Sequence, residues 1–192
     1  MCPVAGSTLF INMGEIFQIT GIPRFGSAFV SVLMSMEPKC IGIHDQGAED
    51  PNWIQSIQDL AIRWDYVADC STYGFFPKAT ISGAKKVYVK KSPVESAKSA
   101  SGKFGYTVDE NAVHSLREIG DAWAVQHSAL IIEENQLFRL ESLRAIWNYC
   151  FQGNSVFPEE KALRLLTMNV QRHNPWEVFS IENSNRLAKQ LF

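Results

Sequence analysis

The sequence has little excess charge and no long apolar run, and each shortage excludes a class of protein. Its 18 basic and 20 acidic side chains give a formal net charge of -2, so no global positive field favours nucleic acid or an anionic membrane. No apolar run reaches the length of about 18 residues that a membrane span needs. The start of the chain also lacks a basic segment followed by an apolar core. We therefore expect a cytoplasmic protein with no membrane span, in which any anion site is local.

Cysteine is also scarce. Cys2, Cys40, Cys70 and Cys150 lie far apart in the sequence, and no two of them form a Cys-x-x-Cys pair. Without clustered histidines nearby, this spacing gives no support for a zinc site, and we expect no bound metal. So few cysteines in a chain of 192 residues favour reduced thiols, although spacing alone leaves a disulfide open.

Segments with strand composition alternate with segments of helical spacing. Strands are expected at residues 15–20, 41–43, 66–69, 86–90 and 129–133, and helices at 27–36, 53–63, 93–101, 108–125, 141–151 and 158–170. Residues 73–81 are expected to form a loop with a short helix, and a surface loop is the alternative for residues 96–103. The alternation predicts a three-layer α/β fold, with helices on both sides of a mainly parallel sheet. We expect one domain over residues 1–192, with residues 1–14 a candidate for a loose N-terminal extension.

The sequence Gly21-Ile-Pro-Arg-Phe-Gly26 lies between the first expected strand and the first expected helix. Glycines allow close approach of the backbone to an anion, and the N–H groups at a helix N-terminus favour negative charge. The glycines have the spacing of a P-loop, but Ser27 and Ala28 stand where that motif requires Lys and Ser or Thr. A P-loop nucleotide or nucleoside kinase is therefore a lesser alternative, and an ordinary tight turn is the purely structural one.

Residues 19–38 resemble the opening of the sulfotransferase family, in which a strand leads into Gly-x-Pro-Arg/Lys-Ser-Gly-Thr and then a helix. Residues 87–99 resemble the second signature of that family, a strand that runs into Arg-Asp-Pro and, several residues later, a serine. The resemblance covers about residues 15–170, and outside these two motifs it is only topological. It implies a P-loop NTPase-like fold and 3′-phosphoadenosine 5′-phosphosulfate as the cofactor.

The resemblance also implies a role for each matching residue. The implied cofactor-binding residues are Gly21, Pro23, Arg24, Phe25, Gly26, Ser27, Ala28, Lys91 and Ser99. Arg24 and the loop amides would hold the sulfate end during transfer, and Lys91 and Ser99 would hold the 3′-phosphate. Sulfuryl transfer needs a general base, and His44 and Asp45, just after the second expected strand, are the candidates.

Several positions depart from the family pattern. Phe25 stands where a small serine is usual, Lys91 replaces a bidentate arginine, and Cys70 stands where a strand-end lysine is expected. We expect a short, divergent sulfotransferase-like protein that transfers a sulfuryl group to an acceptor hydroxyl or amine. The alternative is a catalytically inactive fold used as a binding or assembly module. Protein partners or a homo-oligomer are left open.

Overall fold

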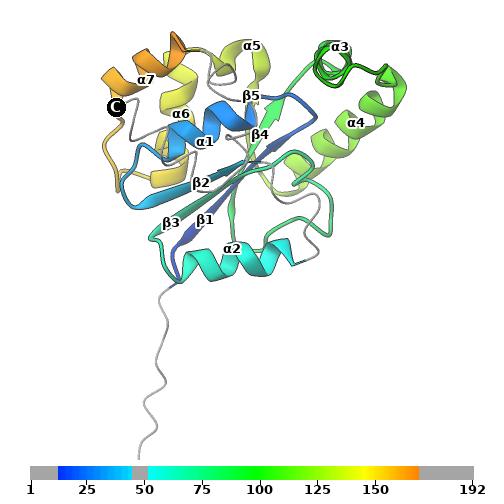
Figure 1. Ribbon diagram of the computed structural model, residues 1–192. Helices are drawn as coiled ribbons and strands as arrows, with labels where there is room; N and C mark the ends of the chain where they lie inside the picture. The colour runs from blue at the N-terminus through cyan, green and yellow to red at the C-terminus, as the bar shows by residue number, and fades with distance from the viewer. Residues whose placement is uncertain (1–12, 45–51, 169–192) are drawn as a thin grey trace, which may run out of the picture.

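A computed structural model describes residues 13–44 and 52–168, which form a five-stranded parallel sheet with helices on both faces (Figure 1). The strands are β1 (Glu15–Gly21), β2 (Cys40–His44), β3 (Tyr66–Cys70), β4 (Lys85–Lys90) and β5 (Leu130–Glu133). The helices are α1 (Ser27–Met34), α2 (Trp53–Ala61), α3 (Pro93–Phe104), α4 (Glu110–Gln126), α5 (Glu134–Leu137), α6 (Leu140–Phe151) and α7 (Glu159–Leu166). The expected α/β class and parallel sheet are confirmed.

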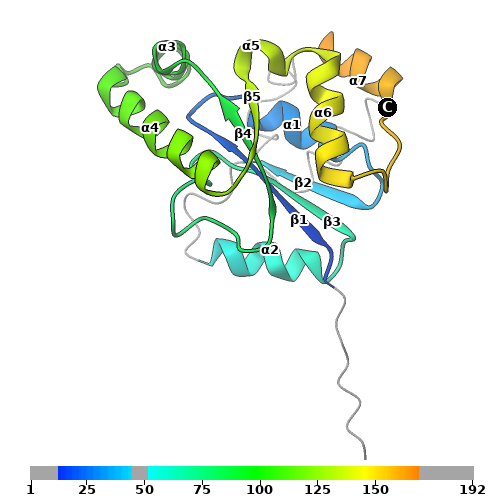
Figure 2. The same ribbon diagram turned by 180° about the vertical axis from the view of Figure 1, so that it is seen from behind.

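Successive side chains of each strand pack into opposite helical layers, because side chains alternate across a strand. Phe17 and Ile19 of β1 lie in the core formed with α1, α6 and α7. Ile16, between Glu15 and Phe17, packs on the other face with the core that includes α2. The two views in Figures 1 and 2 agree on these layers, with α2 across the sheet from α1, α6 and α7.

The strand order is β2-β3-β1-β4-β5, so the sheet is entered at its centre. Helix α1 leads from β1 to the β2 side, whereas α3 and α4 lead from β4 to the β5 side. The connections that follow the neighbouring strands β1 and β4 therefore lead to opposite edges of the sheet. The carboxyl ends of these two strands form the topological switch point of the sheet. Ligands of open α/β sheets bind in the crevice at such a point.

The segment that crosses from β3 to β4 is held by polar side chains of β1. Gln18 Nε2 donates to the carbonyls of Gly74 and Ala79 at 3.2 and 2.7 Å, and its Oε1 accepts from the Ile81 N–H at 3.1 Å. Thr20 Oγ1 donates to the Ser71 carbonyl at 2.8 Å. Residues 71–81 form turns, so the short helix expected at 73–81 is wrong. The Gly74 carbonyl, which such a helix would use internally, accepts from the Gln18 amide instead.

Helix α3 runs through the segment for which a surface loop was the alternative, so the helical prediction is confirmed there. It begins at Pro93, after an N-cap at Ser92 whose side chain accepts from the Glu95 N–H, and it ends at Gly105 with φ 75°. Pro at the first helical position and glycine just past the end are the expected punctuation of a helix. In the described ranges, no helix combines the length and apolar character needed to cross a membrane.

Candidate functional site

The two glycines of the loop after β1 are both required by close packing. A Cβ on Gly21 would lie 2.7 Å from the Val89 carbonyl oxygen and 2.8 Å from the Phe25 ring. Gly26 is the N-cap of α1 with φ 102°, and a Cβ there would lie 2.9 Å from Leu137 Cδ2. The Cα of Gly26 thus faces the apolar side chain of Leu137, and a substituent would meet that side chain first.

Five of the expected cofactor-binding residues are buried: Gly21, Phe25, Ser27, Ala28 and Lys91. Phe25, Ser27 and Ala28 are 1, 6 and 3% exposed, and Phe25 and Ala28 lie in the core with α1. The side chains of Phe25 and Ala28 therefore serve packing, and only their backbone groups remain candidates for contact with a ligand. Helix α1 has no side-chain cap at its N-terminus, where backbone N–H groups and the helix dipole favour an anion.

The structure brings the loop after β1 against α3, which joins the two motifs of the sequence. Arg24 Nε donates to Ser99 Oγ at 3.4 Å, in an exposed contact. One turn earlier on α3, the buried Ser96 Oγ donates to the Pro23 carbonyl at 2.6 Å. Arg24 itself has φ 68°, a backbone conformation that is uncommon outside glycine. Arg24 is thus a turn residue between β1 and α1 whose guanidinium contacts α3.

Lys91 lies just past β4, and its side chain is paired with a carboxylate. Its Nζ forms an ion pair with Glu134 Oε1, at the start of α5, and its side chain is 7% exposed. The guanidinium of Arg117 donates to the Lys91 carbonyl from α4. Lys91 is thus held by a carboxylate that any 3′-phosphate at this position would have to displace. Sequence reasoning assigned Glu134 no part in the site, although an acidic residue directly after β5 lies beside the carboxyl end of β4 in a parallel sheet.

The general base expected at His44 lies apart from these residues. His44 ends β2, is 9% exposed, and pairs with Cys70 of β3, which in turn pairs with Ile19 of β1. His44 therefore lies two strand spacings, about 10 Å, from β1. Cys70, the last residue of β3, is fully buried. Asp45 lies outside the described residues.

The buried thiols are poorly suited to nucleophilic chemistry. Burial raises the pKa of Cys150 to about 12 and the pKa of Cys40 well above its usual range. Among the residues with described coordinates, no three His, Cys, Asp or Glu side chains are grouped so that they could hold a metal ion.

The residues that do meet at the switch point are Arg24, Ser99 and the backbone of the loop after β1. A guanidinium, a hydroxyl and a helix N-terminus are donors, so the arrangement suits an anion with several acceptor oxygens. A comparison of the chain with protein-family models, with curated proteins and with solved structures found no match in any of the three.

Proposed function

We propose that this chain is a sulfotransferase-like protein that binds 3′-phosphoadenosine 5′-phosphosulfate at the carboxyl ends of β1 and β4. The sulfuryl group would then pass to an acceptor hydroxyl or amine. The P-loop-like character of the loop after β1 belongs to the same proposal. Transfer of this kind depends mainly on positioning and on stabilisation of the charge that develops on the transferred group.

The contact between Arg24 and Ser99 is the single observation that carries this proposal. The two residues are 75 positions apart in the sequence, and each was selected from a different motif. Chance placement of two separate motifs would not favour a hydrogen bond between a cation and a hydroxyl at a topological switch point. The contact supports one shared subsite for a phosphate or sulfate group.

The geometry changes how the roles are divided among the residues. Because Lys91 is paired with Glu134, we assign the 3′-phosphate to Arg24 and Ser99 together. Lys91 would contact the phosphate only where the phosphate displaces Glu134. The amides at the start of α1 would then face the 5′ end of the nucleotide. An arginine holds a phosphate more specifically than a lysine, since its planar group offers two parallel donors.

Two observations favour a second candidate function, a catalytically inactive module that keeps the nucleotide site. His44 is buried two strands from β1, and Cys70 occupies a fully buried position where a lysine would assist the transfer. Binding tolerates such changes better than turnover does. The module would use the bound nucleotide, or the surface around it, for assembly.

Release of 3′-phosphoadenosine 5′-phosphate from the sulfated cofactor, measured by chromatography over a panel of phenols, sugars and amines, separates the two candidates. An enzyme should show acceptor-dependent release, and His44→Ala should lower kcat by about 10²- to 10⁴-fold with cofactor affinity preserved. Binding of the cofactor without release for any acceptor would assign the inactive module. Turnover that His44→Ala leaves unchanged would remove His44 as the base and retain the enzyme.

A further inference from the structure

A pocket of about 590 Å³ lies on the α2 and α4 side of the sheet, apart from the switch point. Its walls come from the segment that crosses between β3 and β4, from α4, and from the first half of β4. Lys86, which lines it, pairs in the sheet with Gln18, three residues before Gly21 at the end of β1. The pocket is therefore a different site from the proposed nucleotide site.

Lys86 is a buried cation with only neutral partners. The residue is 7% exposed, and its Nζ donates to the carbonyls of Ile81 and Ala84 at 3.0 Å each. An ammonium has three N–H donors, so these two bonds leave one donor for a further acceptor. No ion pair found within residues 13–44 and 52–168 includes Lys86.

Burial lowers the pKa of Lys86, which shows that its surroundings disfavour the charge. A buried charge is usually paired, because desolvation without a partner is unfavourable. An anion in the adjoining pocket would supply that partner.

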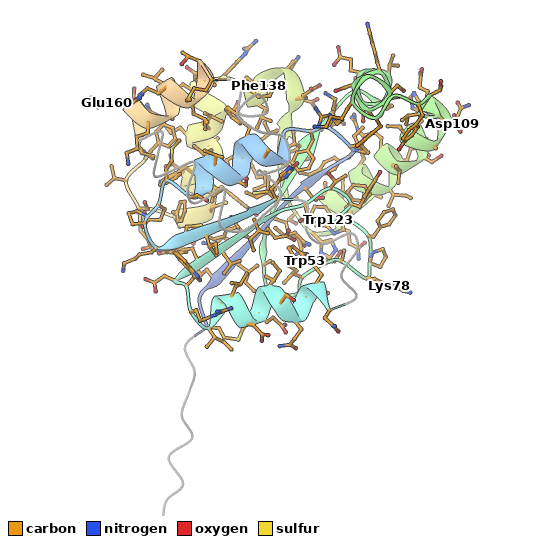
Figure 3. The ribbon with its side chains drawn as sticks, in the orientation of Figure 1. Trp53, Lys78, Asp109, Trp123, Phe138 and Glu160 are labelled. Atoms are coloured by element: carbon orange, nitrogen blue, oxygen red, sulfur yellow. The ribbon has the colours of Figure 1, made fainter. Side chains whose placement is uncertain are left out.

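The other walls combine apolar side chains with the polar side chains of Thr80, Ser82, Gln126 and His127. Phe75 and Trp123 line the pocket and are 1 and 5% exposed. The Trp123 indole N–H donates to Thr80 Oγ1 at 2.9 Å, and the ring of His127 lies 5.3 Å from the Trp123 ring, so the indole is held in place. Figure 3 shows Trp123 on the inner side of α4, facing the crossing segment, with Lys78 on that segment's outer side. Apolar and aromatic side chains with a few polar groups and one buried cation suit a small organic body that carries one negative charge.

We propose that this pocket binds a small planar organic acid, with its ring system against Ile119 and the accessible edge of Trp123 and its acidic group on the Lys86 ammonium. This site does not depend on the proposed function, because none of its residues belongs to the loop after β1 or to α3. Failure of nucleotide binding would leave it standing.

Calorimetric titration with 2-naphthoate and with its neutral counterpart, 2-naphthalenemethanol, tests this site. Wild-type protein should bind the carboxylate about tenfold more tightly than the alcohol, as expected for one hydrogen bond to a charged group. Lys86→Met should remove the preference, whereas Lys78→Met, at an exposed position of the same segment, should keep it. Ala122→Trp, at an exposed position on α4 that lines the pocket, should block both probes without touching Lys86.

Absence of binding, equal affinity of wild-type protein for the two probes, or a preference that survives Lys86→Met would overturn the proposal. If Lys86→Met does not fold, the wild-type protein still decides the matter through reductive methylation mapped by mass spectrometry. Saturating 2-naphthoate should slow methylation of Lys86 and leave that of Lys78 unchanged. Equal rates at Lys86 with and without the probe would reject the site.

Discussion

At the scale of single residues, Gly26 combines a conformational requirement with a packing requirement. Its φ of 102° is one that L-residues rarely adopt, and a Cβ would press on Leu137. We expect Gly26→Ala to lower the free energy of unfolding by about 1–2 kcal/mol, the scale of a left-handed conformation without glycine.

Urea unfolding checks this prediction, with Gly102→Ala as the matched control. Gly102 lies inside α3, and open space surrounds the position that its Cβ would take. The control should raise the free energy of unfolding by about 0.5–1 kcal/mol, as alanine usually does in a helix. Equal effects of the two substitutions would show that neither the backbone angle nor Leu137 constrains the loop.

Substitution of Lys91 and substitution of Glu134, the two members of one ion pair, should change nucleotide affinity in opposite directions. If a 3′-phosphate reaches Lys91, Lys91→Ala should weaken binding of 3′-phosphoadenosine 5′-phosphate by on the order of 1 kcal/mol, because Arg24 and Ser99 are the main partners of that phosphate. Glu134→Gln should strengthen it by on the order of 1 kcal/mol, because a competing negative charge is removed. Adenosine 5′-monophosphate should respond little to either change.

Calorimetric titration of the folded variants measures both effects, and Glu133→Gln is the control for the adjacent charge. Glu133 is exposed at the end of β5 and forms no ion pair with Lys91 in the described structure. Unchanged affinity in both Lys91→Ala and Glu134→Gln would remove Lys91 from the nucleotide site and leave the phosphate to Arg24 and Ser99.

At the level of elements, the buried amide of Gln18 makes three of the side-chain hydrogen bonds that hold the crossing from β3 to β4. Gln18 is the partner of two carbonyls and one N–H of that segment. Gln18→Leu keeps the volume approximately but leaves these buried groups unsatisfied, so we expect a loss of roughly 2–5 kcal/mol in the free energy of unfolding. Hydrogen exchange at the Ile81 amide should become faster in the folded variant.

The control for Gln18→Leu is Gln55→Leu, on the exposed face of α2, where the side chain bonds only Asp59 in the same helix. This surface change should stay within about 0.5 kcal/mol of wild type. A protected Ile81 amide in Gln18→Leu would mean that other contacts order the crossing segment.

Some elements could be predicted from residues inside or directly beside them. Strand β1 and helix α3 were predictable because β-branched residues, Ser92, Pro93 and a terminal glycine act through their own neighbours. The turns at residues 71–81 were not predictable, because Gln18 acts there from more than 50 positions away.

Gly120 is required by a contact between α4 and β4 that helix propensity does not predict. In the sequence it reads as a weak point of a helix. In the structure a Cβ at this position would lie 2.3 Å from the Tyr88 hydroxyl, so glycine allows α4 to approach β4. Helix propensity alone contains no sign of this contact.

At the scale of the whole molecule, the parallel sheet was predictable but the strand order was not. Alternation of strands and helices favours parallel pairing, whereas the order β2-β3-β1-β4-β5 depends on contacts between distant segments. The order determines that β1 and β4 are neighbours, and hence that Arg24 can meet Ser99. The pairing of Lys91 with Glu134 depends on the same order, because it requires β4 and β5 to be neighbours.

Calorimetric titration of wild-type protein with 3′-phosphoadenosine 5′-phosphate and with adenosine 5′-monophosphate determines whether the switch point holds a site for a 3′-phosphorylated adenine nucleotide. The two ligands differ only in the 3′-phosphate. The first should bind more tightly by about 1.5–3 kcal/mol. Arg24→Met should remove most of this difference, and Arg63→Met, at an exposed position after α2, should keep it. Equal binding of the two nucleotides, or no binding of either, would contradict a site for a 3′-phosphorylated adenine nucleotide at the switch point.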